Sequence, residues 1–145
     1  MQAFPHHYKV DSEATPTSDI MLRSEGVRDL PSTAPKEFGG TGHEWSPEGL
    51  LVAAVSDCYI LTFKALSSAA KFDWERITCN TVGTLERIDR VTRFTRYDLE
   101  VRLYAGDEVN VAQAERLLSK AKDICLVTNS LNGECTLDAR LVTAS

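Results

Sequence analysis

The sequence is poor in basic charge. Its 16 Lys and Arg residues are outnumbered by 21 Asp and Glu residues, the net charge is −5 at pH 7, and no cluster of basic residues occurs. Proteins that bind nucleic acid neutralise phosphate groups with a basic surface. The sequence therefore argues against a nucleic-acid partner.

A long apolar run is also missing. The most apolar stretch, residues 46–63, contains Asp57 and is followed by Lys64, so it is interrupted before the roughly 20 residues that cross a bilayer. The N-terminal stretch MQAFPHHYKV does not place an apolar segment after a basic one, as a secretion signal does. We expect a soluble, cytoplasmic protein with no membrane partner.

Closely spaced metal ligands are absent as well. The four cysteines lie at positions 58, 79, 125 and 135, and none is paired at the short spacing that zinc sites use. The three histidines, His6, His7 and His43, are not placed to complete such a site. We expect neither a metal nor another cofactor.

No repeat, low-complexity tract or linker divides the chain, and its length suits one core, so we expect a single domain over residues 1–145. Alternating apolar and charged residues over 94–105 are typical of a strand in an antiparallel sheet with one wet face. The whole order predicts an α+β fold. The expected elements are strands over 6–13 and 19–25, a loop or short edge strand over 29–45, a helix from Ser46, strands over 75–89 and 94–105, a helix over 109–124 and a strand over 134–144.

The helix that follows Ser46 has a clear beginning. Ser46 is a preferred N-cap residue, Pro47 suits the first turn, and Glu48 lies beside the positive helix end. Beyond this turn the helix is apolar on most sides, so we expect it to be central, covered by a sheet or by another subunit. Its clearest apolar stripe is Leu51, Ala54, Cys58, Leu61 and Ala65, and that of the second helix is Ala114, Leu117, Leu118, Ala121 and Ile124.

The four cysteines differ in their surroundings. Cys79 and Cys135 share strand faces with apolar residues, where cysteine behaves as a small hydrophobe, so we expect both to be structural. Cys58 lies on the apolar stripe of the first helix, and Cys125 stands where the second helix ends, so it can face a cavity. Periodicity alone leaves Cys58 and Cys125 open between packing and catalysis.

Two segments together resemble a known family. The stretch PKEFGGTGHEWSPEGLLVAAVSDCY ends just after Cys58, and CLVTNSL begins 67 residues later at Cys125. This pair is similar to the OsmC/Ohr family of osmotically inducible and organic hydroperoxide resistance proteins. The resemblance covers nearly the whole chain and implies an OsmC-like fold, with antiparallel sheets around a central cysteine-bearing helix, in an intertwined homodimer.

The resemblance also implies an activity. The protein would be a thiol-dependent peroxidase that reduces organic hydroperoxides or hydrogen peroxide and is restored by a dithiol reductant. Cys58 would be the peroxidatic cysteine, whose sulfenic acid condenses with the resolving Cys125 to a disulfide. Glu48 would be the carboxylate of the site, and Arg23 and Arg28 are the nearest candidates for the arginine that the family uses to hold the thiolate.

Other residues near these motifs have weaker claims. Asp57 is expected to point to a different helix face from its neighbour Cys58, so it is given no role. His43 is expected to be a surface residue rather than a base. Apolar groups near the site would favour bulky organic peroxides; the candidates are Phe38, Trp45, Tyr59 and Phe63.

The spacing of Glu48 and Cys58 limits what they can do together. Ten residues of helix rise about 15 Å, at about 1.5 Å per residue, so the two side chains of one chain cannot hydrogen-bond. If they share a site, a second subunit must bring them together. Otherwise Glu48 merely interacts with the helix N-terminus.

Two other functions stay open at this point. The first is a non-catalytic dimer that keeps the fold and binds a small apolar ligand or a protein partner. The second is a thiol switch, in which a disulfide between Cys58 and Cys125 alters a partner surface. Thiol reactivity separates these from an enzyme, because Cys58 of an enzyme should react with peroxide far faster than the structural cysteines.

Overall fold

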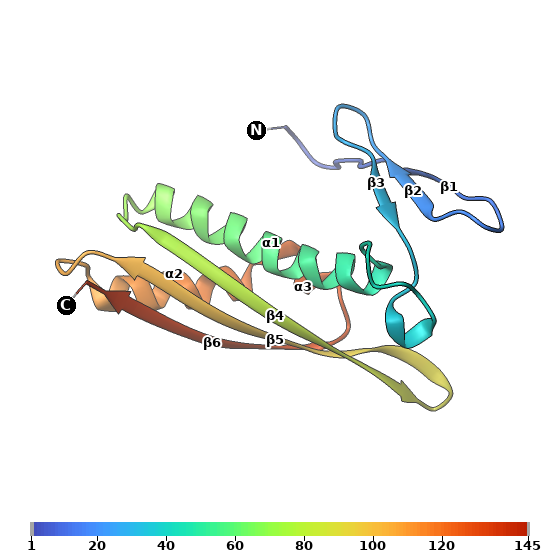
Figure 1. Ribbon diagram of the computed structural model, residues 1–145. Helices are drawn as coiled ribbons and strands as arrows, with labels where there is room; N and C mark the ends of the chain where they lie inside the picture. Colours follow the sequence, from blue (N-terminus) through green and yellow to red (C-terminus); the bar gives the residue numbers. More distant parts are fainter. Residues whose placement is uncertain (1, 145) are drawn as a thin grey trace. The chain divides into compact units, whose positions relative to one another are not determined.

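The computed structural model describes residues 2–144, which fall into two compact units that divide between Leu50 and Leu51 (Figure 1). The boundary lies inside helix α1, Pro47–Ala69, so this helix belongs to both units. Each unit has its own three-stranded sheet. The single domain over residues 1–145 stays a prediction.

The first unit is built on a small antiparallel meander. Its sheet has the order β1-β2-β3, and the strands lie inside or beside the predicted segments but are shorter. The edge strand predicted within the Pro-rich loop is confirmed as β3, where Pro31 is tolerated because it lies at the edge of the sheet. The elements are β1 (Asp11–Glu13), β2 (Ile20–Arg23), β3 (Leu30–Ser32) and a short 3-10 helix, η1 (Lys36–Phe38).

Helix α1 begins as its sequence predicts. The Ser46 hydroxyl accepts a hydrogen bond from the Gly49 amide at 3.0 Å, and the Ser46 carbonyl accepts one from the Leu50 amide at 2.8 Å. Over an 18-residue window α1 has a mean hydropathy of 1.6, which by length and composition alone would suffice for a membrane span. The core helix of a soluble protein meets the same criterion, so this property is weak evidence for a membrane.

The second unit pairs a long hairpin with a parallel strand. Strands β4 and β5 are antiparallel, but β6 runs parallel to β5, so the expectation of antiparallel sheets was wrong at this pair. A parallel neighbour requires a crossover, which the two helices between β5 and β6 supply. The α+β class is confirmed. The elements are β4 (Arg76–Ile88), β5 (Val91–Ala105), α2 (Val111–Asp123), α3 (Leu126–Asn129) and β6 (Glu134–Thr143).

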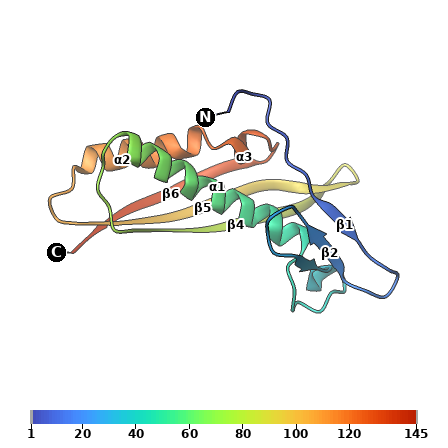
Figure 2. The same ribbon diagram turned by 90° about the horizontal axis from the view of Figure 1, so that it is seen from above.

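The core lies between this sheet and helices α1 and α2, which run along it (Figures 1 and 2). The predicted inner face of β5 is confirmed, and so is that of α2 except at Ile124, whose side chain is 47% exposed. Because only alternate residues of β5 are buried, the helices cover one face of the sheet. The buried side chains are Val55, Tyr59, Phe63, Phe72, Tyr97, Leu99, Val101, Leu103, Ala114, Leu117, Leu118 and Ala121.

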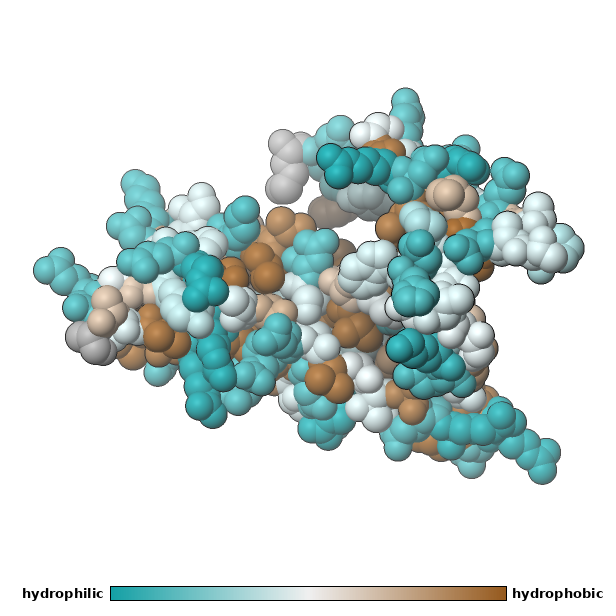
Figure 3. Space-filling model, in the orientation of Figure 1, coloured by the Kyte–Doolittle hydropathy of each residue, from teal (hydrophilic) through white to brown (hydrophobic). Residues whose placement is uncertain are grey.

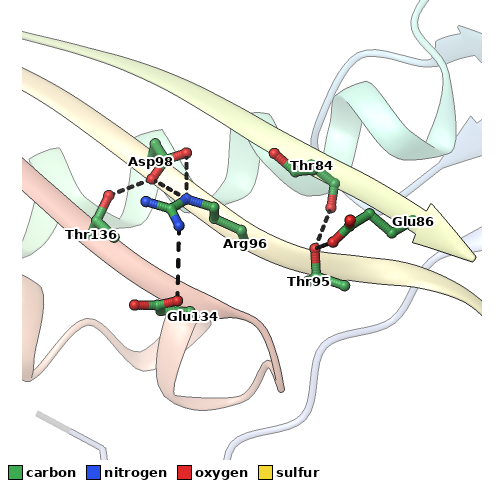
Figure 4. Close-up of polar contacts among 7 residues, drawn as sticks. All are labelled: Thr84, Glu86, Thr95, Arg96, Asp98, Glu134 and Thr136. Carbon is green, nitrogen blue, oxygen red and sulfur yellow. Dashed lines mark hydrogen bonds and ion pairs between the residues drawn. The ribbon is translucent and has the colours of Figure 1, made fainter. Parts of the chain in front are cut away.

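The other face of β5 is wet and carries paired charges (Figure 4). The Arg96 guanidinium donates to the Asp98 carboxylate at 2.8 Å and lies 4.0 Å from the Glu134 carboxylate. Hydrogen bonds from Thr136 and then from Arg96 hold the pKa of Asp98 below its ordinary value. These charges neutralise one another, which suits a solvated face.

Helix α1 turns a different face to the core from the one predicted. The buried side chains are Val55, Tyr59, Phe63 and Ser67, one turn apart along the helix. The predicted stripe through Cys58 and Leu61 lies beside this face, and Leu61 is 58% exposed. Figure 3 shows apolar side chains at the surface over α1. Because α1 is apolar on nearly all sides, its periodicity did not distinguish the two faces.

Tyr59 joins the two long helices. Its hydroxyl is fully buried and donates a hydrogen bond of 2.8 Å to the Leu118 carbonyl on α2. Burial raises the pKa of Tyr59 above its ordinary value, so the phenol stays protonated and keeps this bond at all ordinary pH values.

Tyr59→Phe should lower the free energy of unfolding by about 1 kcal/mol, because the substitution removes one buried hydrogen bond and keeps the ring. Urea unfolding followed by circular dichroism measures this change, and the denaturant dependence should not alter. Tyr8→Phe, at a tyrosine that is 89% exposed, is the matched control and should have no effect. Equal stability of Tyr59→Phe and the unmodified protein would contradict the role given to this bond.

Candidate active site

A groove of about 570 Å³ opens beside Cys58 in the second unit. It lies between the middle of α1 and the segment that includes α3, and most of its wall is apolar. Asp57 is the one charged residue among those that line it. The lining residues are Ala54, Asp57, Cys58, Leu61, Thr62, Ala65, Leu66, Ile124, Leu126 and Val127.

The structure brings Cys58 and Cys125 together. Cys125 is close enough to raise the pKa of Cys58, and both thiols are free. Cys58 is half-buried at the wall of the groove, whereas Cys125 is only 1% exposed. The Cys58 thiol is therefore accessible to a molecule in the groove, whereas the Cys125 thiol is not.

Cys58 is surrounded by uncharged groups. The Thr62 hydroxyl donates to the Cys58 carbonyl at 2.7 Å and lies 4.0 Å from its sulfur. Burial raises the pKa of the Cys58 thiol, the Val127 amide and Thr62 hydroxyl lower it by hydrogen bonding, and neighbouring Cys125 raises it. The net effect is a pKa above the ordinary value, and none of the described groups that shift it is a cation.

Cys125 owes its position to a junction between helices. It follows the end of α2 and is the N-cap residue of α3, with an extended backbone. Its carbonyl accepts hydrogen bonds from the Asn129 amide at 3.0 Å and the Thr128 hydroxyl at 3.1 Å. The sequence did not predict α3, because four residues are too few to show a helical period.

The two remaining cysteines pack against the core from β4 and β6. The Cys79 sulfur lies 3.6 Å from the Thr81 hydroxyl, and burial raises the pKa of both Cys79 and Cys135. Neither lines the groove. These positions agree with the structural role expected for them. Within residues 2–144, no group of three or more His, Cys, Asp or Glu residues could hold a metal ion.

Three predicted site residues belong to the first unit. Glu48 is in the first turn of α1, and its Oε2 is buried without a hydrogen-bond partner in the described chain. Arg23 forms ion pairs of 3.4 Å with Glu13 and Asp29, and Arg28 is exposed in the turn after β2. Since the two units are not placed relative to each other, the roles of Glu48, Arg23 and Arg28 beside Cys58 stay predictions.

The predicted aromatic candidates do not form the groove. Tyr59 and Phe63 are fully buried in the core, on the face of α1 that packs against the sheet and α2. Phe38 and Trp45 are exposed residues of the first unit, at 62% and 51%. The apolar wall instead consists of aliphatic side chains. His43 is exposed, as expected.

Sequence reasoning missed three groups that border the groove. Asp57, which was expected on a different helix face from Cys58 and was given no role, is among the residues that line the groove. The position of Thr62, four residues after Cys58 on a helix, was a signal that could have found it. The Val127 amide left no such signal, since its approach to Cys58 depends on how α3 packs.

Comparison with known proteins agrees with this architecture. The sequence profile described as OsmC-like protein matches residues 40–140. The uncharacterized protein YmaD of Bacillus subtilis (strain 168) is 24% identical over 106 residues, which is 71% of each chain.

Two solved structures show the same fold. An OsmC-like protein of unknown function from Vibrio cholerae O1 biovar eltor superposes with a TM-score of 0.84 at 18% identity, over 94% of this chain and 100% of its own. An organic hydroperoxide resistance protein from Elizabethkingia anophelis gives a TM-score of 0.74 at 20% identity, over 97% and 99% of the two chains. At these identities the likeness establishes the fold. With the profile match over most of its length, the chain belongs to the family of OsmC-like proteins.

Proposed function

We propose that this protein reduces hydroperoxides with the thiol of Cys58 and then forms a disulfide between Cys58 and Cys125. The observation that carries the proposal is a pair of free, neighbouring thiols, of which Cys58 lies at the wall of an apolar groove and Cys125 is buried. Membership of a family whose fold is shared by organic hydroperoxide resistance proteins supports it.

The chemistry needs two thiols and one external reductant. The Cys58 thiolate attacks one peroxide oxygen, the O–O bond breaks, and the alkoxide leaves and takes a proton to become an alcohol. The resulting sulfenic acid reacts with the Cys125 thiol, which forms the S–S bond and releases water. A dithiol reductant then attacks the disulfide and becomes oxidised to its own disulfide, which returns both protein thiols.

The difference in exposure between Cys58 and Cys125 supports different roles for the two thiols. A peroxide in the groove can approach the half-buried Cys58 but not the sulfur of Cys125, which is 1% exposed. Cys125 is therefore protected from the peroxide and positioned to react with the oxidised form of Cys58. This difference supports Cys58 as the proposed peroxidatic cysteine and Cys125 as the proposed resolving cysteine.

A Cys58 thiolate needs a positive charge that none of the groups shifting its pKa supplies. With burial raising its pKa and only neutral donors lowering it, Cys58 holds little thiolate near pH 7. In our proposal, Arg23 or Arg28 supplies the missing positive charge, and the buried carboxylate of Glu48 holds that guanidinium. The ion pairs of Arg23 are exposed, and such pairs contribute about 0 to 1 kcal/mol, so Arg23 can leave them at little cost.

The first test is a count of free thiols on the reduced protein before and after one equivalent of cumene hydroperoxide, with peptide mapping of disulfides. We expect rapid loss of two of the four thiols, both mapped to a bond between Cys58 and Cys125. Cys58→Ser should abolish the loss, and Cys125→Ser should leave a sulfenic acid at Cys58 that dimedone traps. Cys79→Ser is the matched control and should behave like the unmodified protein.

Other outcomes of this test have distinct meanings. Four unreacted thiols would refute the peroxidase and leave a fold that binds an apolar ligand or a partner. A disulfide that forms once, with no continued peroxide consumption when dithiothreitol is present, would indicate a thiol switch.

A second subunit is part of the proposal, because Glu48 and Cys58 are ten residues apart on one helix and the carboxylate lacks a partner. We expect a homodimer, so light scattering should give twice the chain mass of 16.0 kDa. A mass of one chain at micromolar concentration would contradict this arrangement.

Thr62→Val should raise the pKa of Cys58, because it removes a hydroxyl that lies 4.0 Å from the sulfur and lowers that pKa. At pH 7 the alkylation of Cys58 by iodoacetamide, followed on its peptide by mass spectrometry, should become roughly two- to fivefold slower. The rate of either protein should still rise with pH up to the raised pKa, since only the thiolate reacts.

Two further variants separate this effect from a general disturbance. Thr62→Ser keeps the hydroxyl and should restore the rate. Thr128→Val removes a hydroxyl that bonds the carbonyl of the other cysteine, and should leave the Cys58 rate unchanged. Equal rates for Thr62→Val and Thr62→Ser would show that the hydroxyl does not act on the thiolate.

A further inference from the structure

Asp57 gives the groove an unusual charge distribution. It precedes Cys58 on α1, its side chain is exposed, and it is the one charged residue among the ten that line the groove. Seven of the other lining residues are aliphatic: Ala54, Leu61, Ala65, Leu66, Ile124, Leu126 and Val127. A molecule bound against Cys58 therefore meets apolar side chains and one negative charge.

This charge acts on the bound molecule more than on the thiol. The groups that shift the pKa of Cys58 include Cys125, Val127 and Thr62 but not Asp57. An exposed carboxylate still repels another anion within a Debye length of about 8 to 10 Å at ordinary ionic strength. A carboxylate carried by a ligand would enter a groove that contains an acid and no base among its lining residues, and the charge of the arginine proposed beside Cys58 is offset by the Glu48 carboxylate that is proposed to hold it.

We infer that Asp57 is a specificity-determining residue, which makes the groove select neutral hydroperoxides with an apolar alkyl or aryl group over hydroperoxides that carry a carboxylate. The volume of about 570 Å³ lies within the range of pockets that hold small organic ligands. The aliphatic wall supplies affinity for the apolar group, and Asp57 supplies the discrimination by charge. This inference rests on the proposed function for its substrate class.

Two alkylating reagents test the charge without any peroxidase activity. Iodoacetamide is neutral and iodoacetate is an anion, and both form the same kind of thioether bond with Cys58. In Asp57→Asn, the rate of iodoacetate at Cys58 should rise roughly two- to fivefold at low salt, while the rate of iodoacetamide stays the same. The rates are followed on the Cys58 peptide by mass spectrometry.

The controls isolate the position of the charge. Asp57→Glu keeps the charge and should keep the selectivity of the unmodified protein. Glu115→Gln removes one negative charge from the exposed side of α2, outside the groove lining, and should change neither rate. High salt should shrink the difference between Asp57→Asn and the unmodified protein, because it screens the charge.

The second test compares the turnover of two hydroperoxide substrates. With dithiothreitol as reductant, the ratio of kcat/KM for cumene hydroperoxide to that for a fatty-acid hydroperoxide should fall in Asp57→Asn by a similar factor. A change in the alkylation ratio without peroxide turnover would uphold the charge selection at the groove and refute the proposed function. Turnover with unchanged alkylation and substrate ratios in Asp57→Asn would uphold the function and overturn the inference.

Discussion

The rotation of α1 about its own axis is the constraint on which the site depends. Val55, Tyr59 and Phe63 are fully buried against the sheet and α2, and the Tyr59 hydroxyl fixes the helix further by its bond to the Leu118 carbonyl. With this face held in the core, Cys58 comes to lie half-buried at the edge of the packed region. The thiol is therefore placed by residues that take no part in its chemistry.

The topology of the sheet places Cys125 near Cys58. Because β6 runs parallel to β5, the chain must return along the sheet before β6 begins, and α2 makes that return. Cys125 lies at the end of α2, where the backbone turns into α3, so the crossover delivers it to the middle of α1. The same turn brings the Val127 amide to the Cys58 sulfur, so Cys125 and this uncharged donor come from one junction.

Local patterns predicted much of the fold but less of the site. Alternation in β5, the cap at Ser46 and most of the inner face of α2 depend on short-range periodicity, and all were read correctly. The core face of α1 and the direction of β6 depend on which surfaces meet, and a helix that is apolar on nearly all sides does not reveal its partner. The pairing of Cys58 with Cys125 was implied by family resemblance, whereas the place of Asp57 in the groove lining depends on how the segment around α3 packs against α1, which helical periodicity does not show.

The environment of Cys58 also makes ionisation of its thiol unfavourable. Burial is the largest influence on its pKa and favours the neutral thiol, and two neutral hydrogen-bond donors do not reverse it. Asp57, the one charged residue among those that line the groove, supplies no positive charge to a thiolate. The groove lining supplies no cation, so our proposal takes one from elsewhere and assigns Glu48 to hold it, because its Oε2 atom is buried without a hydrogen-bond partner in the described chain. Under the proposed function, the two thiols define where oxidation occurs, and the approach of that cation determines how fast it occurs.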